Sequence, residues 1–121
     1  MTLDDLRGMS GYAYVATPYA KYKFGTDVAF MEAERHTEHL AFAYRIPAFS
    51  PIVHGHRLSR HRRLEPCDHD LWMRLNQPLM EGAEAMILVK LAGWAESRGV
   101  AEEAAYFQAA GKPIVEMEAL P

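Results

Sequence analysis

The chain has 121 residues, half of them hydrophobic, which fits one domain with its own core. Its formal net charge of -3 at pH 7 argues against non-specific nucleic-acid binding as the main role. Cys67 is the only cysteine, so no internal disulfide can form, and no apolar run approaches the roughly 20 residues that span a bilayer. The acidic N-terminus is unlike a secretory signal, so we expect a cytoplasmic protein that acts away from membranes.

The first half of the chain predicts two strands around one helix. Residues 1–9 form a polar stretch that we expect to be loosely held. The β-prone run at 12–16 predicts a first strand that stops before Pro18. Apolar residues recur at helical spacing from 27 to 44, which predicts a helix, and residues 48–50 predict a short second strand.

The second half predicts a long loop and then alternating helices and strands. Residues 54–70 are rich in His, Arg, Asp and Pro without a clear period, which favours a loop. Pro78 marks a break in, or the start of, a helix predicted at 71–80. The remaining predicted elements are a buried strand at 84–91, a helix with an apolar stripe from Val100 to Ala110, and a last strand at 114–117.

This alternation of strands and helices predicts an α/β fold, a flavodoxin-like or Rossmann-like three-layer sandwich with a parallel sheet of four or five strands. We expect one domain over residues 1–121. In such folds ligands bind beyond the carboxyl ends of the strands, near the switch in strand order. Three segments should converge there: residues 17–19, 51–56 and 93–103.

The segment 93–103 joins a glycine-bearing turn to the start of a helix that carries two adjacent acids, Glu102 and Glu103. A helix N-terminus exposes unpaired N–H groups, so Ser97 and Gly99 could bind an anion there. Ordinary capping explains the same residues, because Ser97 is a good cap and the helix dipole favours acids in the first turn. With Gly99 as the cap, Glu102 would stand at the third helical position of a partial capping box.

Together these segments resemble the nucleoside 2-deoxyribosyltransferase-like superfamily, in an uncharacterised branch of it. Residues 14–19 are similar to its first-strand motif and residues 49–54 to the end of its second strand. Ser97, Gly99 and Glu103 match its Ser-x-Gly-x-x-x-Glu pattern, and residues 111–114 look like the entry to its last strand. The resemblance spans about residues 11 to 117.

The resemblance implies cleavage or deoxyribosyl transfer at the N-glycosidic bond of a nucleoside or its 5′-monophosphate. Glu103 would attack the anomeric carbon and form a glutamyl-sugar ester, with Tyr14 orienting its carboxylate and Ser97 holding the sugar 5′ end. No cofactor or metal is implied. A homo-oligomer is expected, since members of the family complete their sites from a neighbouring subunit.

One position departs from the family pattern. Where the family carries an Asp that handles protons at the base, this chain has Asn76, which can hydrogen-bond a base but cannot exchange a proton at neutral pH. Asp68 or Asp70 could substitute from the preceding turns, and Asn76 could instead cap a helix that begins near Pro78. A binding module that kept the fold and lost the chemistry is therefore the alternative function.

The remaining predicted substrate contacts come from the turns after the first three strands. Tyr14 and Tyr19 could stack on a nucleobase, although strand tyrosines more often pack in the core. The full set of predicted contacts is Thr17, Pro18, Tyr19, His54, Gly93, Trp94, Ser97 and Gly99.

Histidines and arginines offer two rival interpretations. A metal-binding role could use a cluster of imidazoles and a thiol, but their spacing fits neither HExxH nor a Cys-x-x-Cys pair, so we predict no metal. A basic patch could recruit a phosphate or be a solvated loop, and without interleaved aromatics it does not favour nucleic acid. The histidine set is His36, His39, His54, His56, His61 and His69 with Cys67, and the patch is Arg57, Arg60, Arg62 and Arg63.

Overall fold

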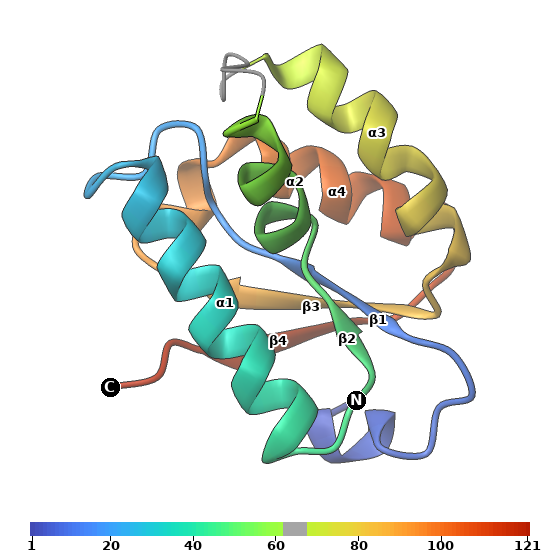
Figure 1. Ribbon diagram of the computed structural model, residues 1–121. Helices are drawn as coiled ribbons and strands as arrows, with labels where there is room; N and C mark the ends of the chain where they lie inside the picture. The colour runs from blue at the N-terminus through green and yellow to red at the C-terminus, as the bar shows by residue number, and fades with distance from the viewer. Residues whose placement is uncertain (62–67) are drawn as a thin grey trace.

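The computed structural model describes residues 1–61 and 68–121, and these form an α/β fold around one parallel sheet (Figure 1). Within this part of the chain the strand order is β2-β1-β3-β4, and every neighbouring pair is parallel. The strands are β1 (Ala13–Ala16), β2 (Ala48–Phe49), β3 (Ala85–Lys90) and β4 (Ile114–Glu118). The fold class predicted from the alternation of elements is confirmed.

Helices cover both faces of the sheet, which gives the three layers of a flavodoxin-like sandwich (Figure 1). From β1 the chain moves outward to β2 and then crosses back over β1 to β3. Because such parallel connections are right-handed, the helices before and after β2 lie on opposite faces. The helices are α1 (Thr26–Phe42) on one face, α3 (His69–Gly82) and α4 (Arg98–Ala109) on the other, and α2 (Pro51–Ser59), which contacts α1, β1 and α3.

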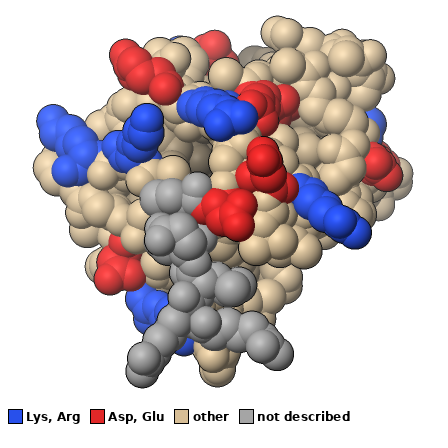
Figure 2. Space-filling view, turned by 90° about the horizontal axis from the view of Figure 1, so that it is seen from above, with Lys and Arg blue, Asp and Glu red and all other residues tan. Residues whose placement is uncertain are grey.

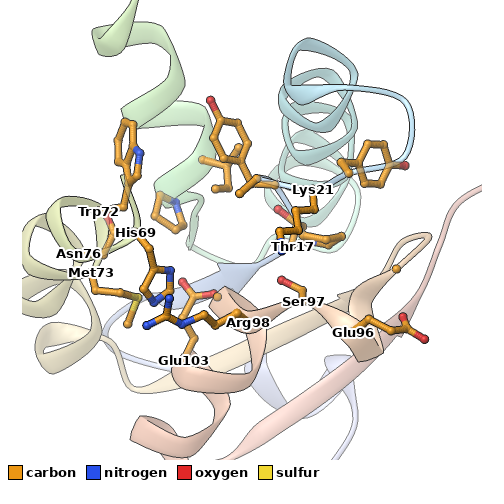
Figure 3. Close-up of a pocket in the computed structure, with 18 of the residues that line it drawn as sticks. Thr17, Lys21, His69, Trp72, Met73, Asn76, Glu96, Ser97, Arg98 and Glu103 are labelled. Carbon is orange, nitrogen blue, oxygen red and sulfur yellow. The ribbon is translucent and has the colours of Figure 1, made fainter. Parts of the chain in front are cut away.

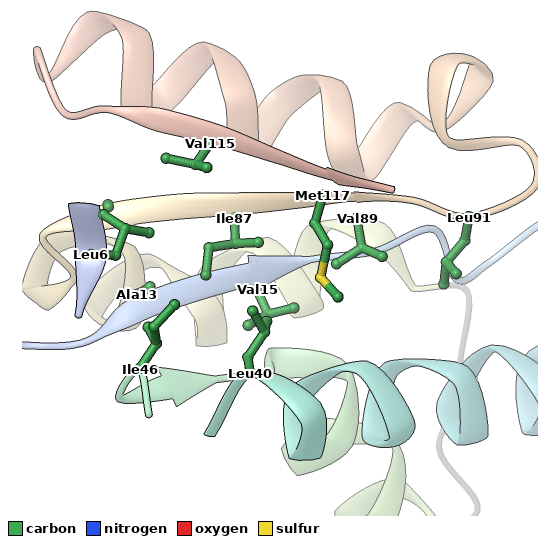
Figure 4. Close-up of a cluster of buried hydrophobic side chains, with 11 residues drawn as sticks. Leu6, Ala13, Val15, Leu40, Ile46, Ile87, Val89, Leu91, Val115 and Met117 are labelled. Atoms are coloured by element: carbon green, nitrogen blue, oxygen red, sulfur yellow. The ribbon is translucent and has the colours of Figure 1, made fainter. Parts of the chain in front are cut away.

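Side chains of β1 alternate between two hydrophobic clusters, one on each face of the sheet. Ala13 and Val15 point toward α1 and pack with Leu40, Ile87 and other apolar residues (Figure 4). Tyr14 and Ala16 lie on the other face, in the cluster that includes Met80 of α3 and Phe107 of α4. This burial on both faces explains why the β3 sequence is a continuous apolar run.

The N-terminal stretch is held more firmly than its polar sequence suggests. Residues Leu3–Leu6 form a short 3₁₀ helix, and Leu6 is only 3% exposed within the cluster on the α1 side. Arg7 donates a hydrogen bond from Nε to the carbonyl oxygen of Tyr44 at 2.9 Å. The expectation of a loose lead-in at 1–9 is wrong, because one apolar side chain and one long-range hydrogen bond fix it.

The expectation of a loop over 54–70 is wrong at both ends of that range, at residues 54–59 and 69–70. Residues 54–59 belong to α2, which starts with Pro51 at its first turn and is capped by Ser50, whose hydroxyl accepts a hydrogen bond from the Val53 N–H at 3.1 Å. Residues 69 and 70 begin α3. The lone cysteine and the last two arginines of the basic patch, Arg62, Arg63 and Cys67, lie outside the described residues.

Helix α3 is longer than predicted and runs through Pro78, which neither starts nor ends it. Its N-cap is Asp68, whose Oδ1 accepts a hydrogen bond from the Leu71 N–H at 3.2 Å. Asn76 therefore lies inside the helix, and the alternative role of a helix cap is wrong for it. None of the described helices combines the length and apolar character needed to cross a membrane.

Candidate functional site

A pocket of about 300 Å³ opens at the carboxyl ends of β1 and β3, where the strand order reverses (Figure 3). This is the edge where parallel α/β sheets bind ligands, and the volume lies at the lower end of the range for small-molecule sites. Its wall is formed by the chain after β1, the start of α2, one face of α3, the turn after β3 and the first turns of α4. All three segments predicted to converge contribute to it.

A buried carboxyl group forms part of the pocket floor. Glu103 of α4 is only 6% exposed, and its Oε2 accepts a hydrogen bond from the hydroxyl of Tyr14 on β1. Tyr14 is fully buried and packs on Phe107, with ring centroids 5.6 Å apart. Glu103 Oε1 makes no hydrogen bond with any residue that the structure describes, so it is open to a molecule in the pocket.

Burial controls the charge of this pair. It raises the pKa of Glu103 to about 8, with the hydrogen bond from Tyr14 acting in the opposite direction and the adjacent Glu102 adding to the rise. Burial also raises the pKa of Tyr14 well above its usual 10, and the neighbouring Glu103 raises it further. Tyr14 therefore stays a hydrogen-bond donor, while the carboxyl group of Glu103 can be neutral or ionised near neutral pH.

The N-terminus of α4 presents backbone N–H groups to the same pocket. Gly93, in the left-handed region at φ 81°, turns the chain after β3, and Ser97 then caps α4 by accepting from the Val100 N–H at 3.2 Å. The N–H groups of Arg98 and Gly99 make no hydrogen bond within the described chain. Gly99 is thus not the cap, and the predicted capping box with Glu102 is wrong, because glycine offers no side-chain oxygen and Ser97 does.

One face of α3 forms the opposite wall. The residues His69, Trp72, Met73 and Asn76 recur at the three- and four-residue spacing that places side chains on one side of a helix (Figure 3). Trp72 meets the Tyr19 ring edge-on with centroids 6.4 Å apart, and its buried indole N–H has no partner among the described residues. Asn76 is 8% exposed, and its amide makes no hydrogen bond to a described residue. This wall offers both apolar surface and unused polar groups.

His69 is linked to the acid that precedes Glu103. Its Nε2 lies 2.6 Å from Glu102 Oε2, and Arg98 Nε donates to the other oxygen of Glu102 at 3.0 Å. The hydrogen bond with His69 lowers the pKa of the Glu102 carboxyl, and Arg98 lowers it further, so this acid is ionised at neutral pH. No sequence pattern marks this pair, because the contact depends on how α3 packs against α4.

The chain after β1 contributes a second set of polar groups. Thr17 is 4% exposed, and its hydroxyl oxygen is buried without a hydrogen-bond partner in the described structure. Lys21 lines the pocket and forms no ion pair with a described residue. Buried polar groups are normally satisfied, so an unpaired hydroxyl in a pocket wall points to a ligand or water as its partner.

A family profile, described as Domain of unknown function (DUF1937), matches residues 11–119. The chain belongs to the DUF1937 family. Comparison with curated proteins finds no match. The DUF1937 profile fits the expectation of an uncharacterised branch and states no activity, so membership of the nucleoside 2-deoxyribosyltransferase-like superfamily stays a prediction. Every residue that lines the pocket falls within the DUF1937 match.

Eight of the eleven site residues predicted from the sequence line the pocket of this DUF1937 domain, and three do not. Tyr14 is fully buried and meets the pocket only through its hydrogen bond to Glu103, so it cannot stack on a base. His54 is exposed on α2 and packs beside Phe49, with ring centroids 5.6 Å apart. Trp94 is outside the pocket wall, and the Lys90 ammonium lies over its ring. The predicted residues that do line it are Thr17, Pro18, Tyr19, Asn76, Gly93, Ser97, Gly99 and Glu103.

His56 takes the place predicted for His54. Two residues along a helix are turned by about 200°, so His54 and His56 of α2 point to opposite sides. His56 is 6% exposed and lines the pocket, with Nδ1 2.6 Å from the Tyr19 hydroxyl and Nε2 2.9 Å from Asp27 Oδ1. The helical register of α2 decides between the two histidines, and the loop expected over these residues carried no such register.

The described arginines of the basic patch contact other parts of the protein, and the described histidines form no metal site. Arg60 pairs with Asp27 at 3.1 Å, and both Arg57 and Arg60 lie over the Phe30 ring. Figure 2 shows Lys and Arg side chains next to Asp and Glu on the face seen from above. Within the described residues no group of three or more His, Cys, Asp or Glu side chains could hold a metal ion. Asp68 and Asp70 do not line the pocket, so neither lies where it could replace an acid at Asn76.

Proposed function

We propose that this DUF1937 protein cleaves or transfers at the N-glycosidic bond of a nucleoside or a nucleoside 5′-monophosphate, with Glu103 as the covalent nucleophile. The observation that supports this most is the state of the Glu103 carboxyl group. One oxygen is held by the buried Tyr14 hydroxyl, and the other is open to the pocket. A carboxylate fixed in this way suits attack on an oxocarbenium-like carbon, as in retaining glycoside transfer.

The reaction would take two steps. In the first, Glu103 Oε1 bonds to the anomeric carbon while the carbon–nitrogen bond breaks, and the base departs with the bonding electron pair and gains a proton. In the second, water or another base attacks the same carbon and loses a proton, and the ester bond to Glu103 breaks to restore the carboxylate. Water as acceptor gives hydrolysis, and a second base gives transfer.

The two walls of the pocket suit the two ends of such a substrate. The α3 wall, with Trp72, Met73 and the Asn76 amide, offers stacking surface and hydrogen bonds for a base. The α4 N-terminus offers the N–H groups of Arg98 and Gly99, which have no partner in the described part of the chain and favour a phosphate or a 5′-hydroxyl. Lys21, which lines the same pocket, adds a cation that has no acid partner among the described residues. These features support a nucleoside 5′-monophosphate over the unphosphorylated nucleoside.

A second candidate is a nucleotide-binding module of the same fold without catalysis. Asn76 favours it, because the amide occupies the place of the expected acid and cannot exchange a proton. Both candidates predict nucleotide binding in the pocket, and only the first predicts bond cleavage.

The deciding experiment measures base release. The protein is incubated with deoxynucleosides, ribonucleosides and their 5′-monophosphates, with and without a second base, and free base and new nucleosides are separated by chromatography. We expect release that falls about a thousand-fold or more in Glu103→Gln. Glu38→Gln, an exposed acid of α1 outside the pocket, is the matched control. Binding of these compounds by calorimetry without any release would favour the binding module and contradict the enzyme.

We also propose self-association, as the resemblance implies. The outer side of α1 leaves large apolar side chains exposed, with Met31 60% and Phe42 77% accessible. Exposed apolar surface of this kind suits a contact between copies. Light scattering of the purified protein tests this, and a monomer at all concentrations would contradict it.

A further inference from the structure

His69, at the start of α3, is a pocket histidine held by a carboxylate. Its Nε2 contacts the Glu102 carboxylate at 2.6 Å, and Glu102 is in turn held by Arg98 at 3.0 Å. An ionised carboxylate only accepts hydrogen bonds, so Nε2 must carry a proton in this contact. The other ring nitrogen, Nδ1, makes no hydrogen bond with a described residue. The contact therefore fixes the tautomer and leaves Nδ1 as the position that can gain or lose a proton.

His69 stands where such a proton is needed. It lines the same pocket as Glu103, and Figure 3 shows both side chains at the side of the pocket where α3 meets α4. It also shares the α3 face with Trp72 and Asn76, the residues offered to the base. Glu102 and Glu103 are consecutive on α4, so one acid can orient His69 while the next faces the sugar.

Departure of a nucleobase from an N-glycosidic bond is difficult without protonation, because the leaving nitrogen carries the bonding pair. Asn76 cannot supply a proton, and Asp68 and Asp70 lie outside the pocket wall. A histidine oriented by a carboxylate is a common general acid and base in enzymes. Within the described pocket His69 has both the orientation and a free ring nitrogen for this task.

We propose that His69, oriented by Glu102, is the general acid and base that protonates the leaving base, in place of the acid missing at Asn76. This inference rests on the function proposed above. In the first step His69 Nδ1–H gives its proton to the base as the carbon–nitrogen bond breaks and Glu103 forms its ester. In the second step neutral His69 takes a proton from the attacking water or base as that ester breaks. The proton is returned to His69, and no other reactant is required.

The test compares two leaving groups. A 7-methylpurine deoxynucleoside carries a positive charge on its base, which leaves as a neutral molecule without gaining a proton. An unmodified purine deoxynucleoside with the same sugar needs protonation. We expect His69→Ala to slow release of the unmodified purine by about 100-fold or more, in the range of general acid catalysis. Release of the 7-methylpurine should change by less than about five-fold, because no proton transfer is required.

Two further variants separate catalysis from structure. Glu102→Gln should show the same pattern with a smaller effect, because it orients His69 and does not touch the base. His39→Ala, near the end of α1 and outside the pocket, should leave both rates unchanged. Equal losses on both substrates in His69→Ala would mean a structural role and would overturn the inference while leaving Glu103 as nucleophile. Release of neither base by the wild-type protein would overturn the proposed function itself, and this inference with it.

Discussion

The substitution Glu103→Gln should change how the stability of the fold depends on pH. Glu103 is buried, and burial raises its pKa from the ordinary 4.5 to about 8. In the unfolded chain the same group has the ordinary value. Between these two pH values the folded state binds more protons than the unfolded state, so the free energy of unfolding must fall as the pH rises.

The size of this effect follows from the two pKa values. The stabilisation by the neutral carboxyl group is fully present below pH 4.5 and is lost as the pH rises toward 8. Above pH 8 the contribution of this group to the free energy of unfolding no longer changes with pH. The slope approaches about 1.4 kcal/mol per pH unit, and the whole loss is about 5 kcal/mol. Such a loss is a large part of the roughly 5–15 kcal/mol that stabilises an ordinary domain.

Urea denaturation of the wild type and Glu103→Gln at several pH values from 5 to 8 measures this loss. Glutamine keeps the hydrogen-bond acceptor for Tyr14 and does not titrate. The difference between the two proteins cancels the other titrating groups, including buried His36, and isolates Glu103. As the pH rises through the middle of this range, the free energy of unfolding of the variant should increase relative to that of the wild type by about 1.4 kcal/mol per pH unit. Parallel curves for the two proteins would refute the claim that burial keeps Glu103 neutral.

Three more variants test other parts of the site. Tyr14→Phe removes the hydrogen bond that lowers the pKa of Glu103. The pH midpoint of kcat/KM for base release, expected near pH 8 in the wild type, should therefore rise by about one to two pH units. An unchanged midpoint contradicts this. Thr17→Val removes a buried hydroxyl that has no hydrogen-bond partner among the described residues. Thermal unfolding should therefore show equal or greater stability, while calorimetry shows roughly ten-fold weaker nucleotide binding. A loss of stability would mean that Thr17 has a protein partner. Gly55→Ala places a Cβ 2.3 Å from the Trp72 ring, so it should displace this wall of the pocket and raise the Kd for nucleotide about ten-fold or more. The control Gly8→Ala places a Cβ with nothing within 4 Å, so its Kd should equal that of the wild type. Equal affinity in the two variants would mean that Trp72 is not part of the binding surface.

The fold was predictable because its main signals are local. The apolar run of β3 identifies a strand buried on both faces, and the helical spacing within α1 identifies the helix that follows β1. The convergence of segments beyond the strand ends follows from topology alone. Helix α2 was missed although Ser50 and Pro51 are a good cap and first turn, because its polar, histidine-rich sequence hides its apolar contacts.

The site was predictable only in part because much of it depends on packing between elements. Only the resemblance to the nucleoside 2-deoxyribosyltransferase-like pattern favoured Glu103 over Glu102 in the sequence, and the structure brings Glu103 to Tyr14, 89 residues away in the chain. No local pattern reveals that His69 meets Glu102, 33 residues later, because that contact requires α3 to lie against α4. The choice of His56 over His54 likewise needs the helical register of α2.

The central claim is that Glu103 becomes covalently bonded to the sugar of the substrate. The most direct measurement is peptide mass spectrometry of the protein quenched during turnover of a 7-methylpurine deoxynucleoside, whose base leaves without protonation. We predict a peptide heavier by one deoxyribosyl group, with fragmentation that assigns the added mass to Glu103 and not to Glu102, and no such peptide from Glu103→Gln. Base release with the added mass on Glu102, or an adduct that persists in Glu103→Gln, would contradict the account.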